Sequence, residues 1–184
     1  MNNHFNYNDY RIRKLSFGET IKSFDCGDAD LNDFIVNDAE NYRKSLLAVT
    51  YVFEHIDSGN IIAYFSLAND RISLSDFKYK TEFNHFRKKR FVNEKRIKSY
   101  PAVKICRLGV SYTMKGYGVG TILLAFIKSF FLIDNKTGCR FITVDAYNNA
   151  VSFYERNDFQ HLRNDDEPQY MMTHLLYYDL NDIA

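Results

Sequence analysis

Residues 115–120 read KGYGVG and lie between two hydrophobic runs, AVKICRLGV at 102–110 and TILLAFIKSFFLI at 121–133. A strand that ends in a glycine-rich turn and opens a helix directs backbone N–H groups and the positive end of the helix dipole at one point, which favours an anion. Glycine allows close approach because it has no Cβ. The turn fits neither the P-loop nor the Rossmann spacing, so the residues alone leave open a phosphate cradle or a simple turn.

The hydrophobic pattern of the rest of the chain predicts strands that alternate with helices. Strands are expected at 10–17, 48–56, 60–74, 102–111, 139–147, near 159–163 and near 170–180. Helices are expected at 29–47, 118–134 and 149–158, the first capped by Asp28 or Asp30. This alternation predicts a mixed α/β (α+β) sheet, and a length of 184 residues favours a single domain over 1–184.

Several missing signals limit the function classes. The uncharged stretch TILLAFI is far shorter than the roughly 18 residues of a membrane-spanning helix, and the polar N-terminus does not resemble a signal peptide. We therefore expect a cytoplasmic protein with no membrane partner. Cys26, Cys106 and Cys139 form no C-x-x-C pair and the five histidines are scattered, so neither a disulfide framework nor a metal site is predicted.

Positive charge is concentrated in residues 78–98. This segment holds nine Lys or Arg residues and two Glu residues, whereas the whole chain has a net charge of only +1. One interpretation is an RNA-binding segment whose cations bind phosphates and whose aromatic residues stack on bases. The cations concerned are Arg87, Lys88, Lys89 and Arg90, and the aromatic residues are Phe86 and Phe91. The other interpretation is a solvated cationic helix whose phenylalanines face the core.

The glycine turn resembles the acetyl-CoA signature of the GNAT superfamily of N-acetyltransferases, R/Q-x-x-G-x-G/A between a strand and a helix. Here the signature reads Lys115-Gly116-Tyr117-Gly118-Val119-Gly120, with Lys at its first position. The resemblance implies that these residues, with Thr121, bind the pyrophosphate of acetyl-CoA. It also implies a mostly antiparallel sheet of six or seven strands, splayed between 102–111 and 139–147, with CoA wedged there and helices flanking the sheet.

The same resemblance assigns roles to the strand before the turn. It implies a β-bulge near Gly109 that exposes backbone donors. The Leu108 N–H would then bond the acetyl carbonyl, and the Val110 backbone would bond the pantetheine arm. A donor aimed at that carbonyl would stabilise the negative charge that develops on its oxygen.

Residues 147–159, YNNAVSFYERNDF, resemble the second half of the family signature, the helix N-x-x-A-x-x-x-Y-x-x-x-G-F. Tyr154 matches the tyrosine that protonates the departing CoA thiolate, a role suited to a hydroxyl that is protonated at pH 7. The family's asparagine falls on Tyr147, next to Asn148, which is the expected contact with CoA. Asp158 stands at the position of the family's glycine.

The N-terminal half resembles a narrower group, the GNAT toxins that acetylate the α-amine of aminoacyl-tRNA. The matching pieces are Phe24-Asp25-Cys26-Gly27, Asp30-Leu31-Asn32-Asp33-Phe34-Ile35, Thr50-Tyr51-Val52 and Ile62-Ala63-Tyr64-Phe65-Ser66-Leu67. An aminoacyl ester has an amine of depressed pKa, so such an enzyme needs no strong base. The sequence agrees, because Ser66 and Asp70 are interpreted as solvated surface residues and no base is predicted.

Three functions therefore stay open. The first is an acetyl-CoA-dependent N-acetyltransferase in which an unidentified primary amine attacks the acetyl group directly. The second is a toxin-type enzyme that acetylates aminoacyl-tRNA and is held in check by an antitoxin. The third is a GNAT-like module that binds RNA or protein without catalysis, because a fold does not by itself fix a function.

Overall fold

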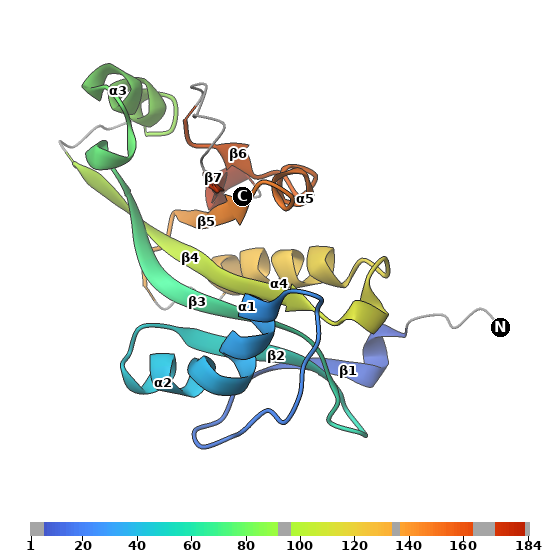
Figure 1. Cartoon of the computed structure of the whole chain (residues 1–184). Helices are drawn as coiled ribbons and strands as arrows, with labels where there is room; N and C mark the ends of the chain where they lie inside the picture. The colour runs from blue at the N-terminus through green and yellow to red at the C-terminus, as the bar shows by residue number, and fades with distance from the viewer. Residues whose placement is uncertain (1–5, 92–96, 134–136, 164–171, 183–184) are drawn as a thin grey trace. The chain divides into compact units, whose positions relative to one another are not determined.

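The computed structural model of the chain describes residues 6–91, 97–133, 137–163 and 172–182 (Figure 1). The chain divides into two compact units. Unit 1 comprises Met1–Ala68 and Ile105–Ile127, and unit 2 comprises Asn69–Lys104 and Lys128–Ala184. Within the described residues, seven strands pair in the order β1-β2-β3-β4-β5-β7-β6.

The elements follow the predicted order along the chain. The strands are β1 (Tyr10–Lys14), β2 (Val49–His55), β3 (Ile61–Ser73), β4 (Ser99–Val110), β5 (Phe141–Tyr147), β6 (Gln160–His161) and β7 (Thr173–Asp179). The helices are α1 (Ala29–Asp33), α2 (Ala39–Lys44), α3 (Lys80–Lys88), α4 (Val119–Ile133) and α5 (Val151–Glu155).

The strand pairing confirms the predicted mixed and largely antiparallel sheet. The β1–β2, β2–β3, β5–β7 and β6–β7 pairs are antiparallel. The β4–β5 pair is parallel and joins Ala102–Lys104 to Phe141–Thr143. Strand β5 pairs with β7 along its whole length, from Phe141 to Tyr147.

The single helix predicted at 29–47 is interrupted in its middle. Asp28 caps α1 by accepting a hydrogen bond from the Leu31 N–H at 3.0 Å, as one of the two expected caps. A π-helical turn over Phe34–Asp38 then joins α1 to α2, with the Ala39 N–H bonded to the Phe34 carbonyl. Phe34 and Ala39 are both buried, and the wider turn places residues five apart on the same face.

The core of unit 1 packs against both faces of the β2–β3 pair. Val52 and Tyr64 are cross-strand partners, and they pack against Phe34 and Ile35 of the interrupted helix. The adjacent partners, Tyr51 and Phe65, point to the opposite face because side chains alternate along a strand. There Phe65 lies 5.1 Å from the Tyr51 ring and 6.0 Å from the Phe126 ring of α4.

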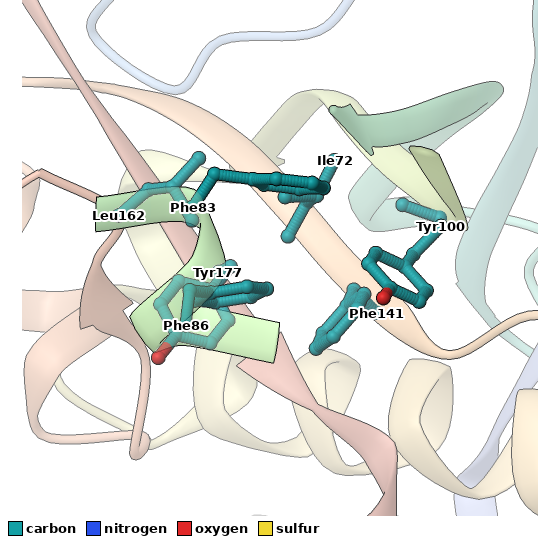
Figure 2. Packing of buried hydrophobic residues seen from close by; sticks show 8 residues of the cluster. Ile72, Phe83, Phe86, Tyr100, Phe141, Leu162 and Tyr177 are labelled. Carbon is teal, nitrogen blue, oxygen red and sulfur yellow. The ribbon is translucent and has the colours of Figure 1, made fainter. Parts of the chain in front are cut away.

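The core of unit 2 is an aromatic cluster between α3 and the sheet (Figure 2). Its members are Ile72, Phe83, Phe86, Tyr100, Ala102, Phe141, Leu162 and Tyr177. The Phe86 ring lies 5.6 Å from the Phe141 ring and 5.4 Å from the Tyr177 ring, which fixes α3 on this face. Such aromatic pairs add stability beyond the area that they bury.

This packing decides between the two interpretations of residues 78–98 for their aromatic side chains. Phe86 is 7% exposed and belongs to the core. Phe91 stacks on Tyr100, with ring centroids 4.3 Å apart and an angle of 4° between the planes. The suggestion that Phe86 and Phe91 stack on RNA bases is therefore wrong, because core packing already uses both rings. Residues 92–96 of the segment lie outside the described residues.

A buried carboxylate holds two arginines in unit 2. Asp179 is 3% exposed, and its oxygens lie 2.7 Å from Arg140 Nε and 3.3 Å from Arg90 Nε. Arg90 also donates to the Phe86 carbonyl at 3.1 Å and to the Tyr177 hydroxyl. The charge of Arg90 is therefore engaged within the protein.

None of the helices that the structure describes has the length and apolar character needed to cross a membrane.

Gly109 of β4 supplies the first prediction. A Cβ at this position would lie 2.8 Å from Cε1 of Tyr64, a fully buried ring that cannot move aside. We expect Gly109→Ala to lower the free energy of unfolding by about 1–3 kcal/mol, because overpacking strains a closed core. Urea unfolding followed by circular dichroism measures this loss.

Gly138 provides the matched control for that measurement. A Cβ there would meet nothing within 4 Å, and its φ is not positive. Gly138→Ala should leave the urea midpoint nearly unchanged. Equal losses from the two variants would show that the Tyr64 ring does not limit position 109.

Glu54 supplies a prediction about pH. Its side chain is buried and accepts hydrogen bonds from Arg13 Nε at 2.8 Å and Arg11 Nε at 2.9 Å. The hydrogen bond from Arg13 is the main reason why the pKa of Glu54 is lowered. A carboxylate with a lowered pKa in the folded state stabilises the fold above its ordinary pKa of about 4.3, and this contribution is lost as the pH falls further.

We expect Glu54→Gln to lower the free energy of unfolding at pH 7 by about 1–3 kcal/mol. The difference in free energy of unfolding between this variant and the unmodified protein should shrink as the pH falls below about 4.3, because Glu54 then becomes protonated. Urea unfolding at a series of pH values tests this. Glu40→Gln is the control, because Glu40 forms a surface pair with Lys44 of the kind that contributes little. A difference that stays constant with pH would contradict the argument.

Candidate functional site

The glycine turn connects β4 to α4 within unit 1. After β4 ends at Val110, one 3₁₀ turn spans Tyr112–Met114, and the exposed residues 115–118 lead into α4 at Val119. Gly116 has φ +85° and Gly118 has φ +75°, a conformation that side chains with a Cβ rarely adopt. The backbone conformation therefore explains why glycine occupies two of the three positions.

The start of α4 presents backbone donors next to these glycines. The Ile122 N–H bonds the Gly118 carbonyl at 3.2 Å, so the amides of 119–121 come before this bond. The first amides of a helix have no partner within it and carry the positive end of its dipole. Val119 is 1% exposed and anchors the helix start in the core. This arrangement suits an anion such as a pyrophosphate.

The Phe24-Asp25-Cys26-Gly27 segment packs against this turn in the same unit. The Tyr112 N–H donates to the Asp25 carbonyl at 2.8 Å. The Asp25 carboxylate accepts from the Gly27 N–H at 2.8 Å and from the Asn32 side chain at 3.1 Å. The segment that resembles the toxins therefore supports the backbone that precedes the glycine turn.

Lys115, the first residue of the signature, faces this supporting segment. Its Nζ lies 5.0 Å from the centroid of the Tyr112 ring and close to Gly27. The pKa of the Asp25 carboxyl is lowered, first by the Gly27 N–H, then by the Asn32 side chain and by the charge of Lys115. The Lys115 ammonium is thus placed beside the glycine turn, among groups of the Asp25–Gly27 segment.

The end of β4 has two distinct faces. Gly109 lies against the rings of Tyr64 and Phe24. Leu108 and Val110 are half-buried and, by the alternation of a strand, point to the opposite face. The close approach to Tyr64 gives Gly109 a role that sequence reasoning missed, and the bulge expected there stays a prediction.

Tyr154 lies on α5 in unit 2. It is 6% exposed, and its ring lies 5.1 Å from the Phe153 ring and 5.3 Å from the Phe159 ring. Burial raises the pKa of the Tyr154 hydroxyl, so the hydroxyl holds its proton at neutral pH. This is the protonation state that a proton donor requires.

Asp158 occupies the position of the family's glycine and adopts a glycine-like conformation, with φ +67°. Asp is one of the few residues with a Cβ that tolerate this region. Lys128 Nζ lies 3.4 Å from the Asp158 carboxylate and 2.7 Å from the Asn157 carbonyl. The backbone turn that follows Tyr154 is thus formed without a glycine.

Other predicted residues have partners that the sequence did not reveal. The side-chain oxygen of Asn148 lies 2.7 Å from His174 Nε2. Ser66 is fully buried and shares a 2.7 Å hydrogen bond with Thr50, so its interpretation as a solvated surface residue is wrong. Asp70 is half-buried and accepts a hydrogen bond from Thr143, so the same correction applies to it.

Two further residues near the turn escaped sequence reasoning. The Tyr64 hydroxyl donates to the Leu31 carbonyl at 2.6 Å. Arg107 lies 3.4 Å from the Asp30 carboxylate and 5.3 Å from the Phe34 ring centroid. Both link the α1 region to strands of unit 1, and only a view of long-range contacts could have found them.

The described residues thus form a mostly antiparallel sheet with a parallel β4–β5 pair, and a glycine turn precedes α4, as the resemblance to the acetyl-CoA-dependent acetyltransferases implies. Residues 76–173 match the family described as an acetyltransferase (GNAT) domain, which is more than half of the chain. The chain therefore belongs to the GNAT acetyltransferases and is an acetyl-CoA-dependent N-acetyltransferase. No curated protein matches the sequence.

Solved structures with the same fold include toxins. A tyrosine-to-phenylalanine mutant of KacT superposes with a TM-score of 0.75 at 21% identity, covering 95% of this chain and 97% of that chain. AtaT complexed with acetyl-methionyl-tRNAfMet gives a TM-score of 0.72 at 20% identity, with coverages of 95% and 97%. A mutant AtaT toxin bound to the C-terminus of the antitoxin AtaR and acetyl-CoA gives 0.66 at 18% identity, with coverages of 95% and 96%.

Proposed function

We propose that this acetyltransferase transfers the acetyl group of acetyl-CoA to the α-amine of aminoacyl-tRNA. The observation that carries the proposal is the similarity of the fold, over 95% of the chain, to AtaT complexed with acetyl-methionyl-tRNAfMet. The contact between the Asp25–Gly27 segment and the glycine turn supports it, because the toxin-like sequence pieces lie beside the family signature.

The glycine turn is proposed to bind the pyrophosphate of acetyl-CoA. The donors would be the amides at the start of α4, with Lys115 supplying positive charge. The residues concerned are Lys115, Gly116, Tyr117, Gly118, Val119, Gly120 and Thr121. The exposure of 115–118 and the positive φ of two glycines support this assignment. Asn148 is proposed as a further contact with CoA.

The reaction is proposed to be direct attack of the amine on the acetyl carbonyl. The Leu108 N–H would stabilise the charge on the carbonyl oxygen, and the Val110 backbone would hold the pantetheine arm. As the C–N bond forms and the C–S bond breaks, the Tyr154 hydroxyl would give its proton to the thiolate. The raised pKa of Tyr154 supports this role, because it keeps the proton in place until the thiolate forms.

The acceptor amine is proposed to lose its proton without a strong base. Ser66 and Asp70, the two polar residues considered as bases, are engaged with Thr50 and Thr143. The α-amine of an aminoacyl ester has a depressed pKa, so a fraction of it is uncharged at neutral pH. This is the second reason to favour aminoacyl-tRNA over a more basic primary amine.

The cationic segment is proposed to bind RNA. Of the four cations at 87–90, Lys88 and Lys89 are exposed, Arg87 is half-buried and Arg90 is engaged with Asp179. Lys88 and Lys89 are therefore the main proposed contacts with phosphates. The similarity to the AtaT toxin bound to the C-terminus of the antitoxin AtaR leads us to propose control by an antitoxin. We also propose a cytoplasmic location and a single functional domain that includes both units.

Tyr154→Phe tests the catalytic assignment, because it removes one hydroxyl and keeps the ring that packs on Phe153 and Phe159. We expect transfer of labelled acetyl from acetyl-CoA to bulk charged tRNA to fall by about 10²–10⁴-fold, with acetyl-CoA affinity retained. Peptide and polyamine pools are assayed beside the tRNA. Label on those pools alone would make the acceptor wrong and keep the acetyltransferase, whereas full activity of the variant would make Tyr154 the wrong acid.

Gly118→Val tests the binding assignment. A β-branched residue at φ +75° is strained and must distort the turn. We expect acetyl-CoA affinity, measured by titration calorimetry, to fall about tenfold or more. Gly138→Val is the control, because its Cβ also has open space and its φ is not positive. Unchanged affinity in a folded Gly118→Val protein would contradict the assignment of the turn.

A further inference from the structure

Unit 2 contains a pocket of about 700 Å³ that lies apart from the residues proposed to bind acetyl-CoA, although Lys89, a proposed contact with RNA, is among its lining residues. Its volume falls in the range of about 300–1,000 Å³ that is usual for small-molecule sites. Its walls are formed by helix α3, by Phe77 before this helix and Lys89 and Arg90 after it, and by strands β6 and β7 with the residues that follow β6. The lining residues that matter here are Phe77, Glu82, Lys89, Arg90, Arg163 and Tyr177.

Part of the pocket lining, called the floor here, is apolar and belongs to buried residues. Phe86, Leu162 and Tyr177 line it, and all three belong to the buried aromatic cluster of unit 2 (Figure 2). Phe77 forms part of the wall and is half-buried, with its ring 5.4 Å from the Phe83 ring and 5.2 Å from the Phe86 ring. A flat ring of a ligand can pack against such a wall without reorganising the core.

The charged residues of the lining are unbalanced. Lys89, Arg90 and Arg163 face the pocket against one carboxylate, Glu82, which leaves two net positive charges before any histidine is protonated. Arg90 is already engaged with Asp179. In the part of the chain that the structure describes, no carboxylate pairs with Lys89 or Arg163. The pocket thus presents two cations that an anionic ligand can neutralise.

Arg163 is held in a defined position. Its Nε donates to the Asp76 carbonyl at 2.6 Å, and its terminal nitrogens donate to no described residue. This single bond orients the planar guanidinium, so two parallel donors stay available in the fork geometry that matches a phosphate. Gln160 adds a further polar group, and its side-chain carbonyl accepts from the Tyr177 hydroxyl at 2.8 Å.

We propose that this pocket binds a nucleotide. Arg163 and Lys89 bind its phosphate, and the base packs on the wall that Phe77 forms. An isolated anion would leave the apolar floor unused, and an apolar ligand would leave both cations unpaired. A free nucleotide and a nucleotide within an RNA chain share this chemistry. The inference does not depend on aminoacyl-tRNA as the acetyl acceptor.

Titration calorimetry of the full chain with AMP tests the proposal. We expect saturable binding that Arg163→Gln and Lys89→Gln each weaken about tenfold, because each removes a charged donor to the phosphate. Glutamine keeps an N–H for the Asp76 carbonyl, and Lys89 is exposed, so both variants should fold. Lys80→Gln is the matched control on α3, because Lys80 is exposed and does not line the pocket.

The glycine turn is a competing site for AMP, because CoA itself contains a nucleotide. AMP in the pocket should keep its affinity in Gly118→Val and lose it in Arg163→Gln. The reverse pattern would place AMP at the turn and overturn the proposal. Adenosine, which has the same base and no phosphate, should bind at least about tenfold more weakly than AMP. Equal binding of the two would make the phosphate assignment wrong.

A short single-stranded RNA with a fluorescent label distinguishes the two sources of the nucleotide. If Arg163→Gln weakens binding of this RNA as well as AMP, the ligand is a nucleotide within RNA. If only AMP responds, the ligand is a free nucleotide, and the proposal again holds. If neither probe binds, or if Arg163→Gln leaves both affinities unchanged, the pocket is not a nucleotide site, whatever the acetyl acceptor proves to be.

Discussion

The contact between Tyr64 and Gly109 is the constraint on which the geometry of unit 1 depends. Tyr64 is fully buried, its hydroxyl is bonded to the Leu31 carbonyl at 2.6 Å, and Phe24 and Phe34 contact its ring. The ring cannot turn away, so β4 can pass it only where the chain has no Cβ. This one contact sets the positions of α1, β3 and the end of β4. The turn that leads to α4 therefore starts from a fixed backbone.

Residues with positive φ lie in both of the segments that resemble the family signature. Gly118 adopts a positive φ before α4, and Asp158 adopts one after α5. The first position favours glycine because residues with a Cβ rarely adopt a positive φ. The second position is held by Asp, whose carboxylate meets Lys128 and whose short polar side chain tolerates the conformation. The sequence therefore departs from the family signature at position 158, but the backbone there still adopts a conformation typical of glycine.

The sequence predicted the features that depend on neighbouring residues. The order of the strands, the helix after the glycine turn, the Asp28 cap and the glycine turn itself follow from local spacing and local conformation, whereas the π-helical break within 29–47 does not. It failed where a side chain's environment comes from residues far along the chain. Ser66 was interpreted as exposed because its partner Thr50 lies on another strand. Phe91 was considered for RNA stacking because the sequence does not show that its ring already stacks on Tyr100. The pocket of unit 2 could not be predicted, since its walls come from segments about 80 residues apart.

The distribution of charge shows why counting cations along a sequence overstates what a ligand can use. Residues 87–90 carry four positive charges, but Arg90 forms an ion pair with Asp179. The same carboxylate also pairs with Arg140. Arg163 stands more than 70 residues away in the sequence, yet it lines the same pocket as Lys89. A phosphate is attracted by cations that lack an internal partner, because a paired charge offers a much weaker field. The charge available to an anionic partner is therefore set by the folded arrangement of Lys88, Lys89 and Arg163, and only in part by the basic run itself.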